Sequence, residues 1–139
     1  MIMVDEYLAV RVLRGHWPDG LPDDELALTA SRHWRLLQAL HGGRGGQLSQ
    51  VLGQLSPAGQ DGVRHPHPEV LQVLDPRPLL DDAAIVAARF GGTGLLVAEA
   101  LVAGLAYGRQ LWFGTATNVG RLLAQAANEL GIEVHVVGA

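Results

Sequence analysis

Short apolar runs alternate with amphipathic segments along this chain, which is the pattern of an α/β protein. The opening residues Met1–Val4 are apolar, as in a buried parallel strand, and they are followed by Asp5. Apolar positions at helical spacing come next, up to Gly15. The clearest predicted elements lie near the end of the chain: a strand over 110–113, a helix over 121–130 and a strand over 132–137.

A long apolar helix is predicted from Leu95 to Tyr107, and it contains a single acid, Glu99. No other charged residue lies between Arg89 and Arg109. An isolated buried carboxylate is costly, so Glu99 must find a partner, a proton or a metal ion. A strand, a polar loop and a helix follow. The acid is therefore expected near the carboxyl-terminal edge of a sheet, where α/β folds usually place their chemistry.

The middle of the chain is predicted to be helical with polar breaks. Thr29 or Ser31 is expected to cap a helix whose apolar face is Trp34, Leu37 and Leu40. A short amphipathic helix over 48–55 and a helix over 79–90 follow, whereas residues 16–24 and 59–68 are rich in polar residues, glycine and proline and are predicted to be loops.

Length and composition favour one domain spanning residues 1–139. No apolar run reaches the roughly 20 residues that a membrane-spanning helix needs, and the first residues do not have the pattern of a secretory signal. The chain has no cysteine. These features predict a cytoplasmic protein without a membrane partner.

The charge pattern leaves the partner open. The formal net charge is -4, and all ten basic residues are arginine. This arginine content fits either a compositional bias or selection for two-point contacts to phosphate. The arginines are scattered along the chain, so the sequence neither supports nor excludes a nucleic-acid partner.

The region from Leu95 to Val137 resembles the carboxyl-terminal half of PIN domains, notably the VapC-type toxins of bacterial toxin–antitoxin pairs. The resemblance is carried by Glu99-Ala100 at a helix start, the strand Leu111–Phe113, the loop Thr115–Asn118 and the Leu130-Gly131 pair before the last strand. Met1–Asp5 resembles the family's opening strand with its first catalytic aspartate. The resemblance implies a single PIN-like domain with a three-layer α/β/α fold around a central, mostly parallel sheet.

The resemblance also implies a function: a metal-dependent endoribonuclease of toxin–antitoxin type. Asp5 and Glu99 would hold Mg²⁺ or Mn²⁺, and Thr117 or Asn118 would orient water or phosphate. RNA would be the substrate, a small antitoxin protein would block the cleft, and the protein would form a homodimer.

PIN nucleases gather three or four carboxylates around the metal ion, and this chain departs from that pattern. Residues 31–41 contain no acid where the family has its second one, and Thr117 and Asn118 are neutral at the fourth position. The site is therefore predicted to be reduced. The alternative function is a catalytically inactive PIN-like domain that binds RNA or protein, and a nucleotide-binding module using the loop 114–120 ranks last.

Each candidate site residue also has a structural explanation, which the sequence leaves open. Asp5 could be the N-cap of the helix that follows it. Glu99 could be paired with a buried arginine or hydroxyl group. Thr117 and Asn118 could cap the helix that begins near Val119.

Overall fold

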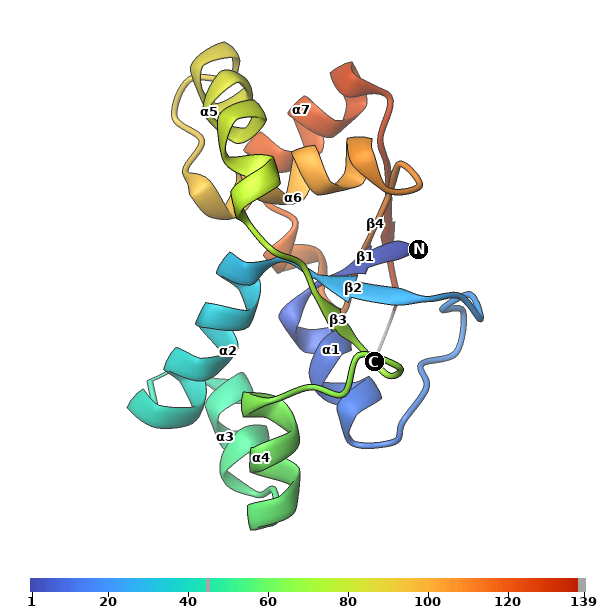
Figure 1. Cartoon of the computed structure of the whole chain (residues 1–139), viewed down its shortest axis with the longest axis vertical. Coiled ribbons are helices and arrows are strands. Elements are labelled where there is room, and N and C mark those ends of the chain that lie inside the picture. Colours follow the sequence, from blue (N-terminus) through green and yellow to red (C-terminus); the bar gives the residue numbers. More distant parts are fainter. Residues whose placement is uncertain (45, 138–139) are drawn as a thin grey trace.

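A parallel five-stranded sheet forms the centre of the protein (Figure 1). The computed structural model describes residues 1–44 and 46–137, so Gly45 and the last two positions of the predicted domain lie outside the described residues. Within the described residues the strand order is β3-β2-β1-β4-β5. The strands are β1 (Ile2–Val4), β2 (Leu26–Leu28), β3 (Gln72–Val73), β4 (Gln110–Phe113) and β5 (Glu133–Val136). In the central register, Met3 of β1 pairs with Ala27 of β2 and Leu111 of β4.

Helices cover both faces of this sheet, as Figure 1 shows. Side chains alternate along β1, so Met3 belongs to one apolar core whereas Ile2 and Val4 belong to the other. The core of Met3 lies under the helices α5 (Leu80–Arg89), α6 (Leu95–Ala106) and α7 (Arg121–Leu130). The opposite core is formed with the helices α1 (Glu6–Leu13), α2 (Ala30–Gly42), α3 (Gln47–Gly53) and α4 (Pro57–Arg64). The predicted three-layer α/β/α fold is therefore confirmed.

Helix α6 is buried from Ala98 to Gly104, as its apolar sequence predicted. Gly104 interrupts the apolar run for a packing reason, because a Cβ atom there would lie only 3.1 Å from Leu111 Cδ2. The missing side chain lets α6 lie directly on β4. No helix of the described residues combines the length and apolar character needed to cross a membrane.

Element positions near the two ends of the chain agree with the prediction, and those in the middle agree less well. The predicted strand over 110–113 and helix over 121–130 are β4 and α7. The predicted loop over 59–68 is wrong in its first half, because α4 (Pro57–Arg64), with Ser56 as its N-cap, extends to Arg64. The short strands β2 and β3 have no counterpart in the prediction, since three and two residues show almost no periodicity.

The predicted apolar face of α2 is wrong at Trp34, whereas Leu40 is partly buried against the core. Trp34 is 59% exposed, and the buried positions are instead Arg32, Leu36 and Ala39. The helix is rotated relative to the prediction because a charged residue occupies its buried stripe. In α7 the helical spacing of the apolar residues predicts that both Leu122 and Leu123 face the core. Leu123 is 1% exposed, but Leu122 is 48% exposed.

The two adjacent leucines of α7 give a test of this packing. Leu123→Ala should lower the free energy of unfolding by about 2–5 kcal/mol, because it leaves a cavity in the core. Leu122→Ala on the exposed side is the matched control and should change it by about 0.5 kcal/mol or less. Urea unfolding of both variants checks this, and equal effects would contradict the assigned face.

Candidate functional site

The order of the strands identifies one edge of the sheet as the place for a ligand. From β1 the chain moves outward to β2 and β3 on one side, and β4 and β5 lie on the other side. Such a reversal between β1 and β4 opens a crevice beyond the carboxyl ends of the two strands. Asp5 directly follows β1, and Gly114 directly follows β4.

Asp5 is buried, and three N–H groups donate hydrogen bonds to its carboxylate. The backbone N–H groups of Leu8 and Gly114 donate to Oδ1 at 2.9 and 3.0 Å, and the Asn118 side-chain amide donates to Oδ2 at 2.8 Å. The bond from Leu8 makes Asp5 the N-cap of α1, as the structural explanation predicted. The other two bonds fix the loop after β4 to the start of α1.

Gly114 makes this attachment possible. A Cβ atom at position 114 would lie 2.7 Å from Tyr7 Cβ and 3.3 Å from the backbone nitrogen of Leu8. Any other residue would push β4 away from the start of α1 and lengthen the bond to Asp5.

Glu6 is a second buried acid in the site, and the sequence analysis did not select it. Its Oε1 accepts a hydrogen bond from Arg32 Nη1 at 2.6 Å, and Arg35 Nη1 lies 2.9 Å from its Oε2. The contact to Oε2 is an ion pair without hydrogen-bond alignment, since Oε2 has no hydrogen-bond partner. The arginine spacing in α2 was the available signal, because residues three apart lie on one face of a helix.

Asn118 connects these two acids. Its side-chain amide nitrogen donates to Asp5 and, at 3.4 Å, to Glu6 Oε1, while its Oδ1 accepts a hydrogen bond from Arg35 Nη1 at 3.3 Å. The alternative that Asn118 or Thr117 caps α7 is wrong, because the N-cap of α7 is Gly120 and no side chain caps it. Thr117 is exposed, and its backbone N–H donates to Thr115 Oγ1.

Glu99 is bound to the start of α2. Its Oε1 accepts hydrogen bonds from the backbone nitrogen of Ser31 at 2.9 Å and from the Ser31 hydroxyl at 2.7 Å. The explanation of Glu99 as a carboxylate paired with a hydroxyl group is therefore confirmed. A carboxylate at a helix N-terminus is also favoured by the helix dipole.

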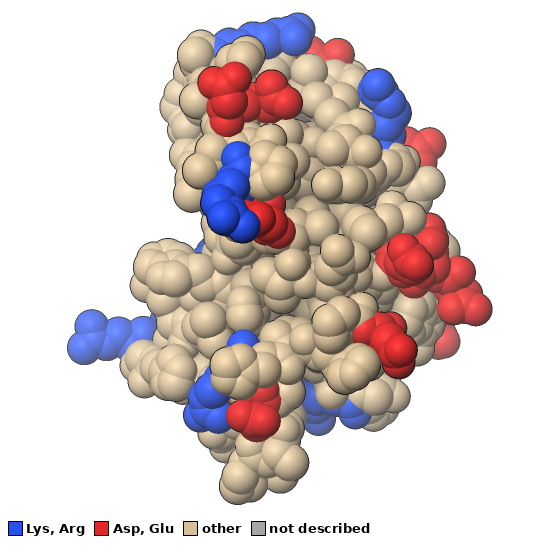
Figure 2. Space-filling model, viewed as in Figure 1, with Lys and Arg blue, Asp and Glu red and all other residues tan. Residues whose placement is uncertain are grey.

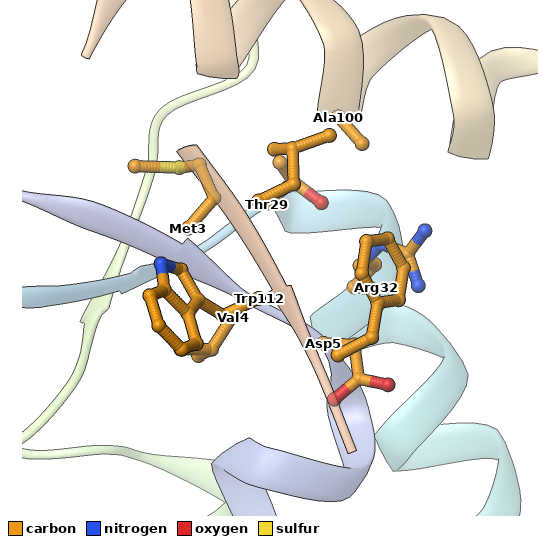
Figure 3. Close-up of a pocket in the computed structure, with 9 residues that line it drawn as sticks. Met3, Val4, Asp5, Thr29, Arg32, Ala100 and Trp112 are labelled. Carbon is orange, nitrogen blue, oxygen red and sulfur yellow. The ribbon is translucent and has the colours of Figure 1, made fainter. Parts of the chain in front are cut away.

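The backbone N–H of Ser31 is a group that an N-cap side chain can accept from, but here it donates to Glu99. Thr29 occupies the N-cap position of α2, as expected, but its side chain makes no capping bond. Its hydroxyl is buried beside a small cavity that Asp5 and Arg32 also line (Figure 3).

The carboxylates fit a metal ion poorly. Among the described residues, no three His, Cys, Asp or Glu side chains are grouped so that they could hold one. Mg²⁺ needs oxygen ligands in near-octahedral geometry, and the Asp5 carboxylate already accepts three N–H donors. The predicted binding of Mg²⁺ or Mn²⁺ by Asp5 and Glu99 stays a prediction.

A groove of about 900 Å³ lies beside this network. Helix α1 contributes Arg11, its C-cap residue is Arg14, and α2 contributes Arg35. None of the residues that line the groove is acidic. The full lining is Tyr7, Val10, Arg11, Arg14, Arg35, Gln47, Leu48, Val51, Gly114, Thr115, Ala116, Thr117, Asn118 and Val136.

The positive lining of the groove is a local feature. On the face shown in Figure 2, charged side chains of both signs are scattered over a mostly uncharged surface. The net charge of -4 gives no general attraction to nucleic acid. Recognition of an anion would therefore depend on the groove itself.

Comparison with protein-family models, with curated proteins and with solved structures found no match to this chain. The family resemblance therefore rests on the residues quoted above, and it stays a prediction.

The titration of Asp5 gives a test of its burial. Burial raises the pKa of Asp5 above its ordinary value of 3.8, and the bonds from Leu8, Asn118 and Gly114 oppose this only in part. Asp5 thus contributes most to stability below the unfolded pKa, and this contribution is lost as the pH rises through the folded pKa. The difference in the free energy of unfolding, wild type minus Asp5→Asn, should fall as the pH rises from below the ordinary value of 3.8 toward neutrality.

Asp75→Asn is the matched control, because a hydrogen bond from Arg77 lowers the pKa of that exposed acid. The contribution of Asp75 to stability is present above its unfolded pKa and is lost as the pH falls. The difference between wild type and Asp75→Asn should therefore rise with pH. Urea unfolding across this range measures both differences. A rise with pH for Asp5 would show that burial does not dominate its titration.

Proposed function

We propose that this protein is a PIN-like domain that binds RNA in the groove and does not cleave it. The observation that carries the proposal is the groove at the carboxyl edge of the sheet, with three arginines and no acid in its lining. Its position beyond β1 and β4 is the place where parallel α/β sheets bind ligands.

The charges around the groove favour a phosphate-bearing ligand. Asp5 and Glu6, which Asn118 joins, balance Arg32 and Arg35, so the positive charge offered to a ligand comes from the arginines of the groove lining. Arg14, the C-cap residue of α1, is one of them. Guanidinium groups bind phosphate oxygens through two N–H donors at once, which suits them to a polyanion.

The acids of the site support binding rather than catalysis. Asp5 holds the loop 114–118 to α1, Glu6 neutralises arginine, and Glu99 binds the start of α2. Each acid has a structural partner inside the protein. A hydrolytic metal site would instead need carboxylates directed at a shared ion and its activated water.

Binding can be tested with fluorescence anisotropy on a labelled single-stranded RNA. Arg14→Ala should weaken binding for every RNA sequence, because a phosphate contact carries no base information. The slope of log K against log salt should become shallower by about 0.7, the value for one phosphate of a single strand. Arg77→Ala is the control, since Arg77 pairs with Asp75 and does not line the groove. Equal effects of the two variants would contradict binding in the groove.

The second candidate is the metal-dependent ribonuclease of toxin–antitoxin type. It is favoured by one contact, since the candidate residues Asp5 and Asn118 are joined at 2.8 Å and Asn118 also lines the groove. A small antitoxin in the groove and a homodimer would belong to this function, and both rest on the resemblance alone.

An RNA cleavage assay decides between the two candidates. The wild-type protein should leave a mixed RNA pool intact with Mg²⁺, with Mn²⁺ and with EDTA, because Asp5 and Glu99 are each bonded to separate segments of the protein. Cleavage that needs millimolar metal and is lost in both Asp5→Asn and Glu99→Gln would establish the ribonuclease instead. Cleavage that survives in both variants would come from another site or a contaminant.

A further inference from the structure

Two arginines share the buried carboxylate of Glu6, and they differ in their surroundings. The side chain of Arg32 is 3% exposed, donates to Oε1 at 2.6 Å and lies with its guanidinium carbon 5.2 Å from the centre of the Phe113 ring. The side chain of Arg35 is 40% exposed and lines the groove. Arg32 is thus held inside the protein, whereas Arg35 lies at the surface of the groove.

This difference decides which arginine can change partners. If Arg32 left Glu6, the guanidinium group would remain buried without its partner, and an unpaired buried charge is costly. If Arg35 turned toward the groove, Arg32 would still neutralise Glu6, and Asn118 would still donate to it at 3.4 Å. The ion pair of Arg35 with Glu6 also lacks hydrogen-bond alignment. Breaking it therefore costs less free energy than breaking an aligned hydrogen bond.

The groove wall beside Arg35 offers further polar groups. Asn118 Oδ1 accepts a hydrogen bond from Arg35 at 3.3 Å, which places the loop 114–118 next to the guanidinium group. Thr115 and Thr117 of the same loop line the groove, and their hydroxyl groups can donate to an anion. No acid of the groove lining opposes a negative ligand here.

We propose that Arg35 and the loop 114–118 form a subsite for one phosphate group of the bound RNA. Arg35 exchanges its contact with Glu6 for a two-point contact to phosphate oxygens, while Arg32 keeps Glu6 neutral. The hydroxyl groups of Thr115 and Thr117 complete the contacts. This inference rests on the proposed function and adds the residue that recognises phosphate.

Inorganic phosphate is the probe, and the side-chain amide of Asn118 is the reporter. Titration of ¹⁵N-labelled protein at constant ionic strength, with chloride as the control anion, should give saturable shifts of the Asn118 NH₂ signals. These shifts should be lost in Arg35→Gln and retained in Arg77→Ala, which removes an arginine that pairs with Asp75 and does not line the groove. Thermal melting should show that Arg35→Gln folds, since Arg32 still pairs with Glu6.

Arg35→Lys is the second variant in case Arg35→Gln fails to fold. It keeps the charge but removes the two-point geometry, so the phosphate shifts should weaken. Absence of phosphate shifts in wild type, or shifts that persist without Arg35, would overturn the subsite. RNA binding that remains in that case would leave the proposed function standing, whereas loss of salt-dependent RNA binding by wild type would remove the proposed function itself.

Discussion

The buried carboxylate of Glu6 is the constraint on which this site depends. A charge inside a protein must be paired and hydrogen-bonded, and Glu6 is fully buried. Arg32 of α2 pairs with Glu6 and donates a hydrogen bond to it, Arg35 adds a second ion pair, and Asn118 adds a second donor from the loop after β4. One carboxylate therefore fixes α1, α2 and the loop at the carboxyl edge of the sheet relative to each other.

The other two buried acids of the site are also hydrogen-bonded within the protein. Asp5 accepts three N–H donors, and Glu99 accepts two hydrogen bonds from Ser31. These carboxylates hold segments of the protein together across long distances in sequence. The groove beside them is lined by arginines and by the polar loop 114–118.

The structure has the three-layer arrangement that the family resemblance implies. Asp5 and Asn118 lie together at the carboxyl edge of its sheet. Glu99 is bonded to Ser31 in the first turn of α2, which begins just after the carboxyl end of β2. The catalytic and metal-binding roles that the resemblance implies for these residues stay predictions.

The sequence alone determined the elements with strong periodicity. The helix α7, the apolar helix α6 and the strands β1 and β4 follow from local patterns of apolar residues, and so does the α/β class. The buried stripe of α2 could not be read in this way, since Arg32 occupies it and its partner Glu6 is remote in sequence. Very short strands such as β3 form only because neighbouring strands supply hydrogen-bond partners. The roles of Glu99 and Asn118 were likewise decided by tertiary structure, because a buried polar group takes whatever partner the fold brings within reach.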